Sequence, residues 1–315
     1  MGDLDLVRPT GLDGFDDLFR DADARRKPIG VAAAGGDDPT VIQALRIAAD
    51  RGWVRPVLVG PEARIREVAE SQGLALDGFR IVSAEGDAVA RTAVDLVRAG
   101  EVSALMKGQI ATPALMAPVL DPAAGLRTGR TICQVVLMEI PRDGRRFLLA
   151  DTGITVRPDL RRRVDILRQA VEVAQALGSE RPRVALMAAT ESVKTEMPET
   201  VEADEIARRN RQGEFPDCVI EGPLSFDLAY ATDAGARKGI GGSVVGAADV
   251  MVFPNLLAAN LTVKAIMYTA DCRFGGVLRG TSAPVVFMSR ADSVETRLHS
   301  LALALRIIDA EPATP

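Results

Sequence analysis

Short apolar runs alternate with helical segments along most of this chain, and that alternation limits the possible folds more than any other feature. In the first 100 residues each predicted strand is a brief apolar run followed by a predicted helix, and these strands fall at 28–34, 54–60 and 79–83. Strands joined through helices pair in parallel and are buried on both faces. The sequence therefore predicts an α/β protein with parallel sheets.

A predicted hairpin interrupts this alternation. Two apolar runs at 132–140 and 146–150 are joined by Pro141-Arg-Asp-Gly144, a typical turn sequence. Because a hairpin breaks the strand–helix rhythm, we expect a second domain to begin there. We also expect the closing strand and helix to complete the sheet begun by the first strand. The expected domains are a discontinuous first domain and a continuous second one, at 1–135 with 283–315 and at 136–282.

The closing strand-to-helix junction is the first candidate site. An apolar run at 284–288 precedes a segment that has apolar residues at helical spacing from Val294 onward. Ser289 and Arg290 are thus expected where the carboxyl end of a strand meets the positive end of a helix dipole, a place that suits an anion such as phosphate. The alternative from spacing alone is a turn residue and a loop salt-bridge partner.

A second junction of the same kind carries Lys107 and Thr112. A predicted strand ends at Lys107 and a helix is expected to begin near Thr112. Open α/β sheets bind ligands at the carboxyl ends of their strands, so both are candidate substrate-binding residues. Arg127 and Arg130 then follow in a glycine-bounded loop, where they could hold a phosphate in bidentate fashion. The alternative is a solvated basic loop.

Composition excludes several classes of protein. The net charge of -5 argues against a nucleic-acid binder. The acidic start lacks the pattern of a signal peptide, and no apolar run approaches the roughly 20 residues of a membrane helix. Cys133, Cys218 and Cys272 are far apart, which favours reduced thiols over disulfides or a zinc site. We therefore expect a soluble, cytoplasmic protein.

Few residue types remain for catalysis. His299, the only histidine, stands beside the apolar stripe of the last predicted helix and is expected at the surface. The triplet Arg161–Arg163 is expected to form a solvated helix face. With one histidine and scattered cysteines, neither a metal centre nor a thiol nucleophile is expected. Hydroxyl, amide and cationic groups at strand ends favour catalysis by positioning and charge stabilisation.

Seven segments, taken in chain order, resemble those of the phosphate acetyl/butyryltransferases. The butyryltransferase branch is the nearer resemblance, through its GLRTGR and SRADS segments. The segments span most of the chain: Met106-Lys-Gly, Gly125-Leu-Arg-Thr-Gly-Arg130, Glu221-Gly-Pro-Leu-Ser-Phe-Asp227, Gly246-Ala-Ala-Asp249, Phe253-Pro-Asn-Leu256, Asn260 with Lys264, and Ser289-Arg-Ala-Asp-Ser293.

The resemblance implies an activity and an architecture. The reaction would be acyl-CoA plus phosphate giving acyl phosphate and free CoA, with a short, butyryl-like acyl group. The substrates would be acyl-CoA and phosphate, with no permanently bound cofactor, no metal, and no nucleic acid or membrane as partner. The implied fold is α/β, a two-domain isocitrate/isopropylmalate-dehydrogenase-like fold with parallel sheets and an interdomain cleft. Proteins of this family are usually homodimers, so a homodimer is expected here.

The resemblance also implies roles for residues. Ser289 would hydrogen-bond the developing oxyanion and Arg290 would hold phosphate, while Arg130 would bind substrate. Asn260 and Lys264, four apart on one face of a predicted helix, are further substrate-binding candidates. We add Lys107 and Thr112, from their place at a strand end, as ligands for phosphate or for the CoA pyrophosphate.

The general base is the least determined role. The acetyltransferases use an aspartate a few residues after the serine–arginine pair, and here Thr296 stands at that position. Glu295 is the candidate in its place. Asp292 and Glu295 also have the spacing of a helix N-cap and its capping-box partner, which would give Glu295 a structural role instead.

Three alternatives stay open from the sequence. One is a phosphate acetyltransferase. Another is a non-catalytic or regulatory paralogue, which the changed base position would suit. The third is a hydride-transferring decarboxylase of the related dehydrogenase fold, but the acidic metal ligands and the nucleotide loop that it requires are not evident.

Overall fold

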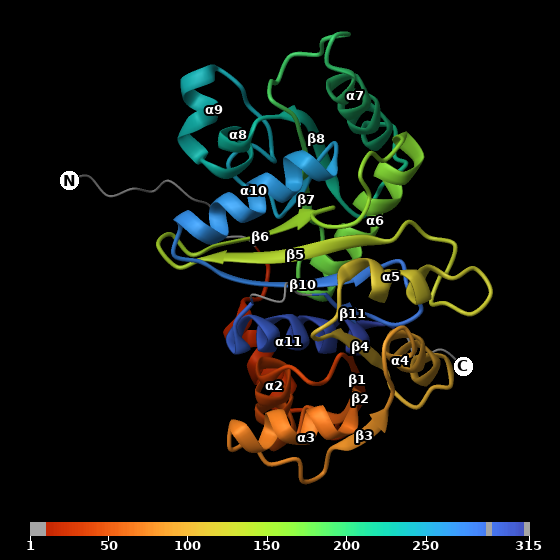
Figure 1. Cartoon of the computed structure of the whole chain (residues 1–315). Coiled ribbons are helices and arrows are strands. Elements are labelled where there is room, and N and C mark those ends of the chain that lie inside the picture. The colour runs from red at the N-terminus through yellow and green to blue at the C-terminus, as the bar shows by residue number, and fades with distance from the viewer. Residues whose placement is uncertain (1–10, 288–291, 312–315) are drawn as a thin grey trace. The chain divides into compact units, whose positions relative to one another are not determined.

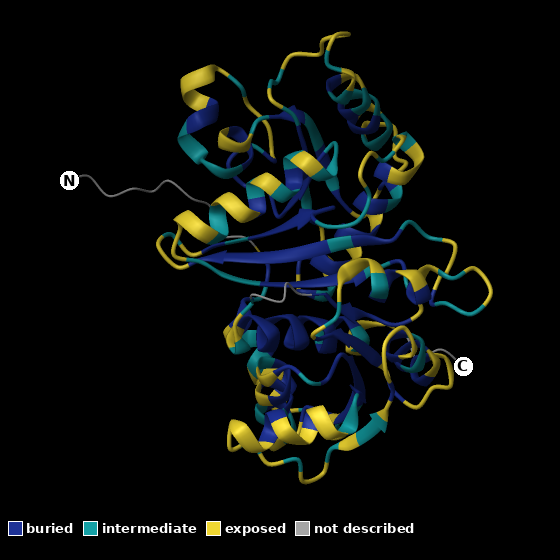
Figure 2. Ribbon diagram, viewed as in Figure 1, coloured by how far each residue is buried: buried dark blue, intermediate teal, exposed yellow. Residues whose placement is uncertain are grey.

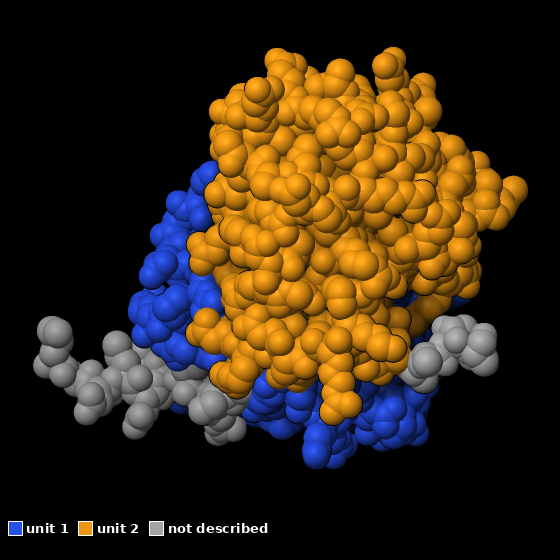
Figure 3. Space-filling model, turned by 90° about the horizontal axis from the view of Figure 1, so that it is seen from below, with its two compact units in different colours: residues 1–14, 133–274 blue, residues 15–132, 275–315 orange. Residues whose placement is uncertain are grey.

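The computed structural model describes residues 11–287 and 292–311, and these form two compact units. Unit 1 comprises residues 11–14 and 133–274, and unit 2 comprises the rest of the described chain (Figure 3). Each unit is built on a mostly parallel sheet with helices, so the predicted α/β class is confirmed (Figure 1).

Unit 2 contains the sheet predicted from the start of the chain. Its strands lie in the order β3-β2-β1-β4-β11-β10, and only β10 runs antiparallel to its neighbour β11. The strands are β1 Ile29–Ala34, β2 Val54–Gly60, β3 Arg80–Ser83, β4 Ala104–Lys107, β10 Arg273–Arg279 and β11 Val285–Val286. The helices are α1 Phe15–Asp23, α2 Pro39–Asp50, α3 Glu62–Ser71, α4 Ala88–Arg98, α5 Thr112–Leu120 and α11 Val294–Ala310. The predicted strands are confirmed, and β11 joins the sheet beside β4 as expected.

The last helix begins where predicted but is capped by a different residue. Ser293 is the N-cap of α11, and its Oγ accepts a hydrogen bond from the Thr296 N–H. The prediction that Asp292 is the cap was wrong. Glu295 is then only two residues beyond the cap, which is one short of the capping-box spacing.

The surface position predicted for His299 was also wrong. The side chain is only 3% exposed, because α1 covers this part of α11 with aromatic residues. The imidazole stacks on the Phe15 ring, with 4.1 Å between centroids, and the Phe19 ring lies 5.5 Å away. Figure 2 shows α11 buried along most of its length.

The predicted hairpin opens the longer segment of unit 1, residues 133–274, and it is confirmed. Strands β5 Cys133–Ile140 and β6 Arg145–Ala150 pair antiparallel, and the remaining strands continue in parallel from β6 in the order β9-β7-β8. These strands are β7 Arg183–Met187, β8 Val219–Leu224 and β9 Val250–Val252. The helices are α6 Leu160–Ala176, α7 Pro198–Arg211, α8 Phe226–Tyr230, α9 Thr232–Lys238 and α10 Leu256–Thr269.

One member of the predicted solvated triplet is buried. Arg161 and Arg162 are exposed, but Arg163 is 0% exposed. Its guanidinium donates to the carbonyl oxygens of Met187, at the end of β7, and Glu199, in the first turn of α7, at 3.5 and 3.1 Å. The charge is accommodated in the interior because the guanidinium donates to these carbonyls and its Nη1 also lies 3.5 Å from Glu202 Oε2.

Candidate active site

Three parallel strands of unit 2 end together at one edge of its sheet. Ala34, the last residue of β1, pairs with Lys107, the last residue of β4. Val286, the last residue of β11, pairs with Met106. The loops that follow these neighbouring strands therefore start side by side, at the edge where open α/β sheets bind ligands.

Main-chain hydrogen bonds join the first two of these loops. The Gly108 N–H donates to the Ala34 carbonyl at 2.8 Å, and the Gln109 N–H donates to the Gly35 carbonyl at 2.9 Å. The approach is so close that a Cβ on Gly108 would lie 2.0 Å from the Gly35 oxygen. Gly35 itself has φ +78, a conformation that favours glycine. The two glycines thus fix the shape of the edge.

Lys107 and Thr112 both lie at this edge, in different environments. Lys107 is 2% exposed at the end of β4, whereas Thr112 is exposed and is the first residue of α5. The structure therefore brings both residues together with the loops after β1 and β4. Ser289 and Arg290 lie outside the described residues. The strand that leads toward them, β11, ends beside Met106.

The candidate base Glu295 is solvent-accessible. Its side chain is 72% exposed, and its Oε1 lies 3.7 Å from Nε2 of His299. Thr296, at the position of the acetyltransferase aspartate, is instead 8% exposed and lies 3.0 Å from the Ser293 hydroxyl, oxygen to oxygen. Thr296 thus takes part in the helix cap, and Glu295 is the carboxylate with access to solvent.

The loop with the two candidate arginines is tethered elsewhere on unit 2. The Thr128 hydroxyl donates to the Gly280 carbonyl and the Ser282 N–H donates to the Leu126 carbonyl, both at 2.8 Å. The turn at 280–282 precedes β11, so these bonds lie toward the amino ends of β11 and β4. The structure does not bring the tethered segment together with Lys107, and the role of Arg130 stays a prediction.

Asn260 and Lys264 belong to a second strand edge, in unit 1. Asn260 donates from Nδ2 to the Thr152 carbonyl at 3.1 Å, just beyond the end of β6, while Lys264 is exposed. The adjacent Asp151 is 4% exposed and accepts hydrogen bonds from four N–H groups, those of Gln134, Gly153, Ile154 and Thr155.

Burial raises the pKa of Asp151, and those four hydrogen bonds oppose the rise. Through the same hydrogen bonds, Asp151 holds the loop at 151–155, which includes the Thr152 carbonyl that Asn260 contacts.

Sequence reasoning missed Arg297, which is 0% exposed at the first edge. Its Nη1 donates to the carbonyl of Lys107 at 3.3 Å. A signal was available in the sequence. Arg297 stands four residues before Leu301, so it lies on the apolar stripe of the last helix, where a charge needs a buried partner.

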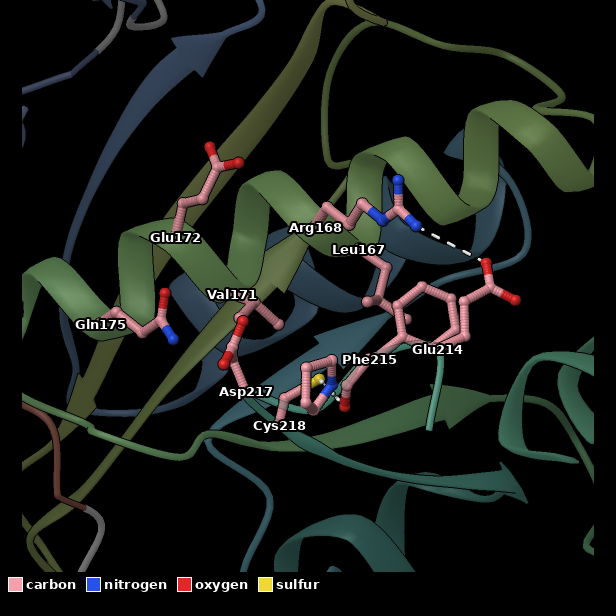
Figure 4. Close-up of a pocket in the computed structure, with 10 residues that line it drawn as sticks. Leu167, Arg168, Val171, Glu172, Gln175, Glu214, Phe215, Asp217 and Cys218 are labelled. Atoms are coloured by element: carbon pink, nitrogen blue, oxygen red, sulfur yellow. Dashed lines mark hydrogen bonds and ion pairs between the residues drawn. The ribbon is translucent and has the colours of Figure 1, made fainter. Parts of the chain in front are cut away.

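The described chain also has a cavity of about 240 Å³ between α6 and the segment before β8 (Figure 4). Phe215 and Cys218 line it, and Arg168 and Glu214 lie 3.5 Å apart as an ion pair beside it. It contains none of the candidate residues, and it lies near the amino end of β8.

Comparison with known proteins decides the family. The family model "Phosphate acetyl/butaryl transferase" matches residues 87–305. The chain belongs to the phosphate acetyl/butyryl transferase family. The family resemblance predicted from the seven segments is thus confirmed. None of the helices within the described ranges has the length and hydrophobicity needed to span a bilayer.

Some relatives of this chain are named phosphate butyryltransferase and others phosphate acetyltransferase. The phosphate butyryltransferase of Clostridium acetobutylicum is 38% identical, over 87% of this chain and 91% of its own. The phosphate acetyltransferase of Thermotoga maritima is 37% identical, over 89% and 96%. The crystal structure of a branched-chain phosphotransacylase from Enterococcus faecalis V583 matches with a TM-score of 0.78 at 31% identity, over 89% and 99%.

Proposed function

We propose that the protein transfers a short acyl group between CoA and inorganic phosphate, giving acyl phosphate and free CoA. The observation that carries this proposal is the edge of unit 2, where Lys107 is buried at the end of β4. In the sequence, Ser289 and Arg290 follow the end of the neighbouring strand β11 after two intervening residues. A buried cation at the end of one strand, with a serine–arginine pair following the neighbouring strand in the sequence, suits a phosphate that must attack a thioester.

The chemistry follows from these groups. A phosphate oxygen attacks the acyl carbonyl carbon, and the carbonyl becomes a tetrahedral oxyanion that the Ser289 hydroxyl stabilises. The C–S bond then breaks, and CoA leaves as a thiolate. Arg290 and Lys107 hold the phosphate, and Thr112 adds a hydroxyl at the same edge. In the reverse direction Glu295 takes the thiol proton, a modest task for a thiol of pKa about 8.5.

We further propose that the acyl group is butyryl-like, with acetyl as the alternative. The GLRTGR and SRADS segments support this preference, as does the branched-chain name of the Enterococcus faecalis relative. Arg130, Asn260 and Lys264 are proposed to bind the substrates, with CoA and phosphate as the only ligands and no resident cofactor.

The proposed architecture is the two-domain isocitrate/isopropylmalate-dehydrogenase-like fold, assembled as a homodimer in the cytoplasm. The division of the chain at 132–133 and 274–275 into two compact units supports the discontinuous first domain. The three free cysteines agree with a reducing compartment.

The decisive experiment measures CoA thiol release from acetyl-, propionyl-, butyryl- and longer acyl-CoAs, with and without phosphate. Release that requires phosphate establishes the transferase, and the order of kcat/KM gives the acyl group. Highest kcat/KM on acetyl-CoA would favour the acetyltransferase alternative. No release from any of these substrates would overturn the proposal in favour of a regulatory paralogue.

A further inference from the structure

The side chain of Arg297 links three segments at the proposed phosphate edge. It is the fourth residue after the N-cap of α11 and is completely buried. Its Nε donates to Thr40 Oγ1 at 2.8 Å, in the first turn of α2, and its Nη1 donates to the Lys107 carbonyl at 3.3 Å. One guanidinium thus connects the start of α11 to the elements that follow β1 and β4.

The contact with Thr40 continues into the cap of α2. The Thr40 hydroxyl donates to Asp38 Oδ1 at 2.6 Å, and the same oxygen accepts the N–H groups of Thr40 and Val41. Asp38 is 6% exposed, and its Oδ2 lies 3.9 Å from Nη2 of Arg297. Arg297 therefore fixes the amino end of α2 as well as the end of β4.

The guanidinium keeps its charge in this buried place. Burial lowers the pKa of Arg297, and the carboxylates of Asp38 and Asp292 oppose the change. An arginine still remains protonated. Its Nη2 donates no hydrogen bond to any residue of the described ranges. The guanidinium therefore places a fixed positive charge next to the main-chain carbonyl of Lys107.

We propose that Arg297 is a positioning residue for phosphate, holding Lys107 and the first turn of α2 in the geometry that binds the anion. The proposal rests on the proposed function. Arg297 acts on Lys107 through the main chain of that residue and on α2 through the Thr40 hydroxyl. A lysine could not replace it fully, since one ammonium lacks the planar fork that reaches two acceptors in different directions.

The test is a double-mutant cycle read out in phosphate affinity. The KM values for phosphate and for butyryl-CoA are measured for wild type, Arg297→Met, Lys107→Met and the double variant. Arg297→Met is expected to raise the phosphate KM roughly tenfold or more, the scale of a lost charged hydrogen bond, with a smaller change for butyryl-CoA. The double variant should be worse than Lys107→Met alone by less than the full effect of Arg297→Met, because part of that effect acts through Lys107.

Arg145→Met is the matched control. Arg145 is also 0% exposed and also donates to main-chain carbonyls, those of Ala229 and Ala248, but it lies at the start of β6 in unit 1. Its loss should lower the Tm and leave the phosphate KM unchanged. Equal increases in phosphate KM for both variants, or fully multiplicative effects in the cycle, would overturn the positioning role.

Two further measurements keep the test decisive. If Arg297→Met does not fold, Arg297→Lys and Thr40→Val are measured in its place, and an unchanged phosphate KM in both overturns the proposal. If wild type releases no CoA, the proposed function fails. The positioning role is then decided by whether inorganic phosphate raises the Tm of wild type but not that of Arg297→Lys; equal shifts overturn it.

Discussion

At the scale of single residues, buried arginines organise much of this molecule. Arg145, Arg163 and Arg297 are each 0% exposed and each donate to main-chain carbonyl oxygens. A guanidinium can be buried when several fixed acceptors surround it, because its N–H donors are spread over a planar group and each can reach an acceptor. Each of these arginines donates to the main chain, whether or not a carboxylate also lies nearby.

Arg290 is predicted to be essential for phosphate use. Arg290→Ala should raise the phosphate KM or cut turnover by well over tenfold, because a charged contact to the reacting anion is lost. Steady-state kinetics at varied phosphate measure this, with Arg161→Ala, at an exposed residue of α6, as the comparison variant. Near-wild-type kinetics in Arg290→Ala would remove the proposed phosphate contact.

The cysteine thiols are predicted to react slowly with an aromatic disulfide reagent. Burial raises the pKa of Cys218 to about 11, so little of it is thiolate near pH 8. Its labelling rate should climb about tenfold per pH unit until that pKa is approached. Cys272, which is only partly buried, should react first.

Residue-resolved mass spectrometry after timed labelling separates these thiols, and Cys218→Ser identifies the slow phase. Fast labelling of Cys218 at pH 8 would show that its thiol is not shielded as described. Slow protein thiols also leave a low background when released CoA is measured with the same reagent.

At the scale of elements, the junction of β1 and β4 depends on Gly108. Gly108→Ala should destabilise the protein by about 1–3 kcal/mol or more, because its Cβ would lie 2.0 Å from a backbone oxygen and the neighbouring loop must shift. Chemical denaturation measures the loss. Gly241→Ala, with nothing within 4 Å of the added Cβ, is the control.

A Gly108→Ala variant as stable as Gly241→Ala would mean that the two loops are not in close contact. Activity measured on the same samples should fall along with stability, because Lys107 immediately precedes the displaced residue.

Periodicity in the sequence predicted the elements well, since strand and helix patterns depend on local residue order. The strands of unit 2, the hairpin of unit 1 and the start of α11 all follow from it. The helix cap was missed because Asp292 and Ser293 are both good caps, and only the backbone decides between them. The burial of His299 was missed because its cover, Phe15, is remote in sequence.

In the candidate site, too, the features set by local sequence could be predicted and the long-range contacts could not. Lys107 and Thr112 could be placed at a strand edge from local pattern, and the structure puts them there. The contact of Arg297 with Thr40 joins residues 257 positions apart, which no local pattern reports. The tether of Thr128 to Gly280 spans 152 positions and was equally out of reach.

At the scale of the whole molecule, the outer face of α10 is predicted to form a dimer contact. Leu257, Leu261 and Tyr268 are 69, 60 and 78% exposed and share one face, opposite the buried Ala259 and Val263. Leu261→Glu should convert the proposed homodimer to a monomer, because it places a charge in an apolar interface. Light scattering after size exclusion measures the mass.

Val193→Glu is the control for that measurement. Val193 is 51% exposed but lies outside α10, so its substitution should leave the mass unchanged. A wild-type mass for Leu261→Glu would place any dimer contact elsewhere, and a monomeric wild type would exclude the homodimer.

The arginine anchors have a consequence for how this scaffold can be altered. Arg297 and Arg163 are each the fourth residue after a helix N-cap, and each holds the carbonyl oxygen of a strand's last residue, Lys107 or Met187. Every amino acid supplies that same oxygen. A substitution at position 107 therefore removes the ammonium of Lys107 while the main-chain contact with Arg297 is kept, so the charge and the anchor can be tested separately.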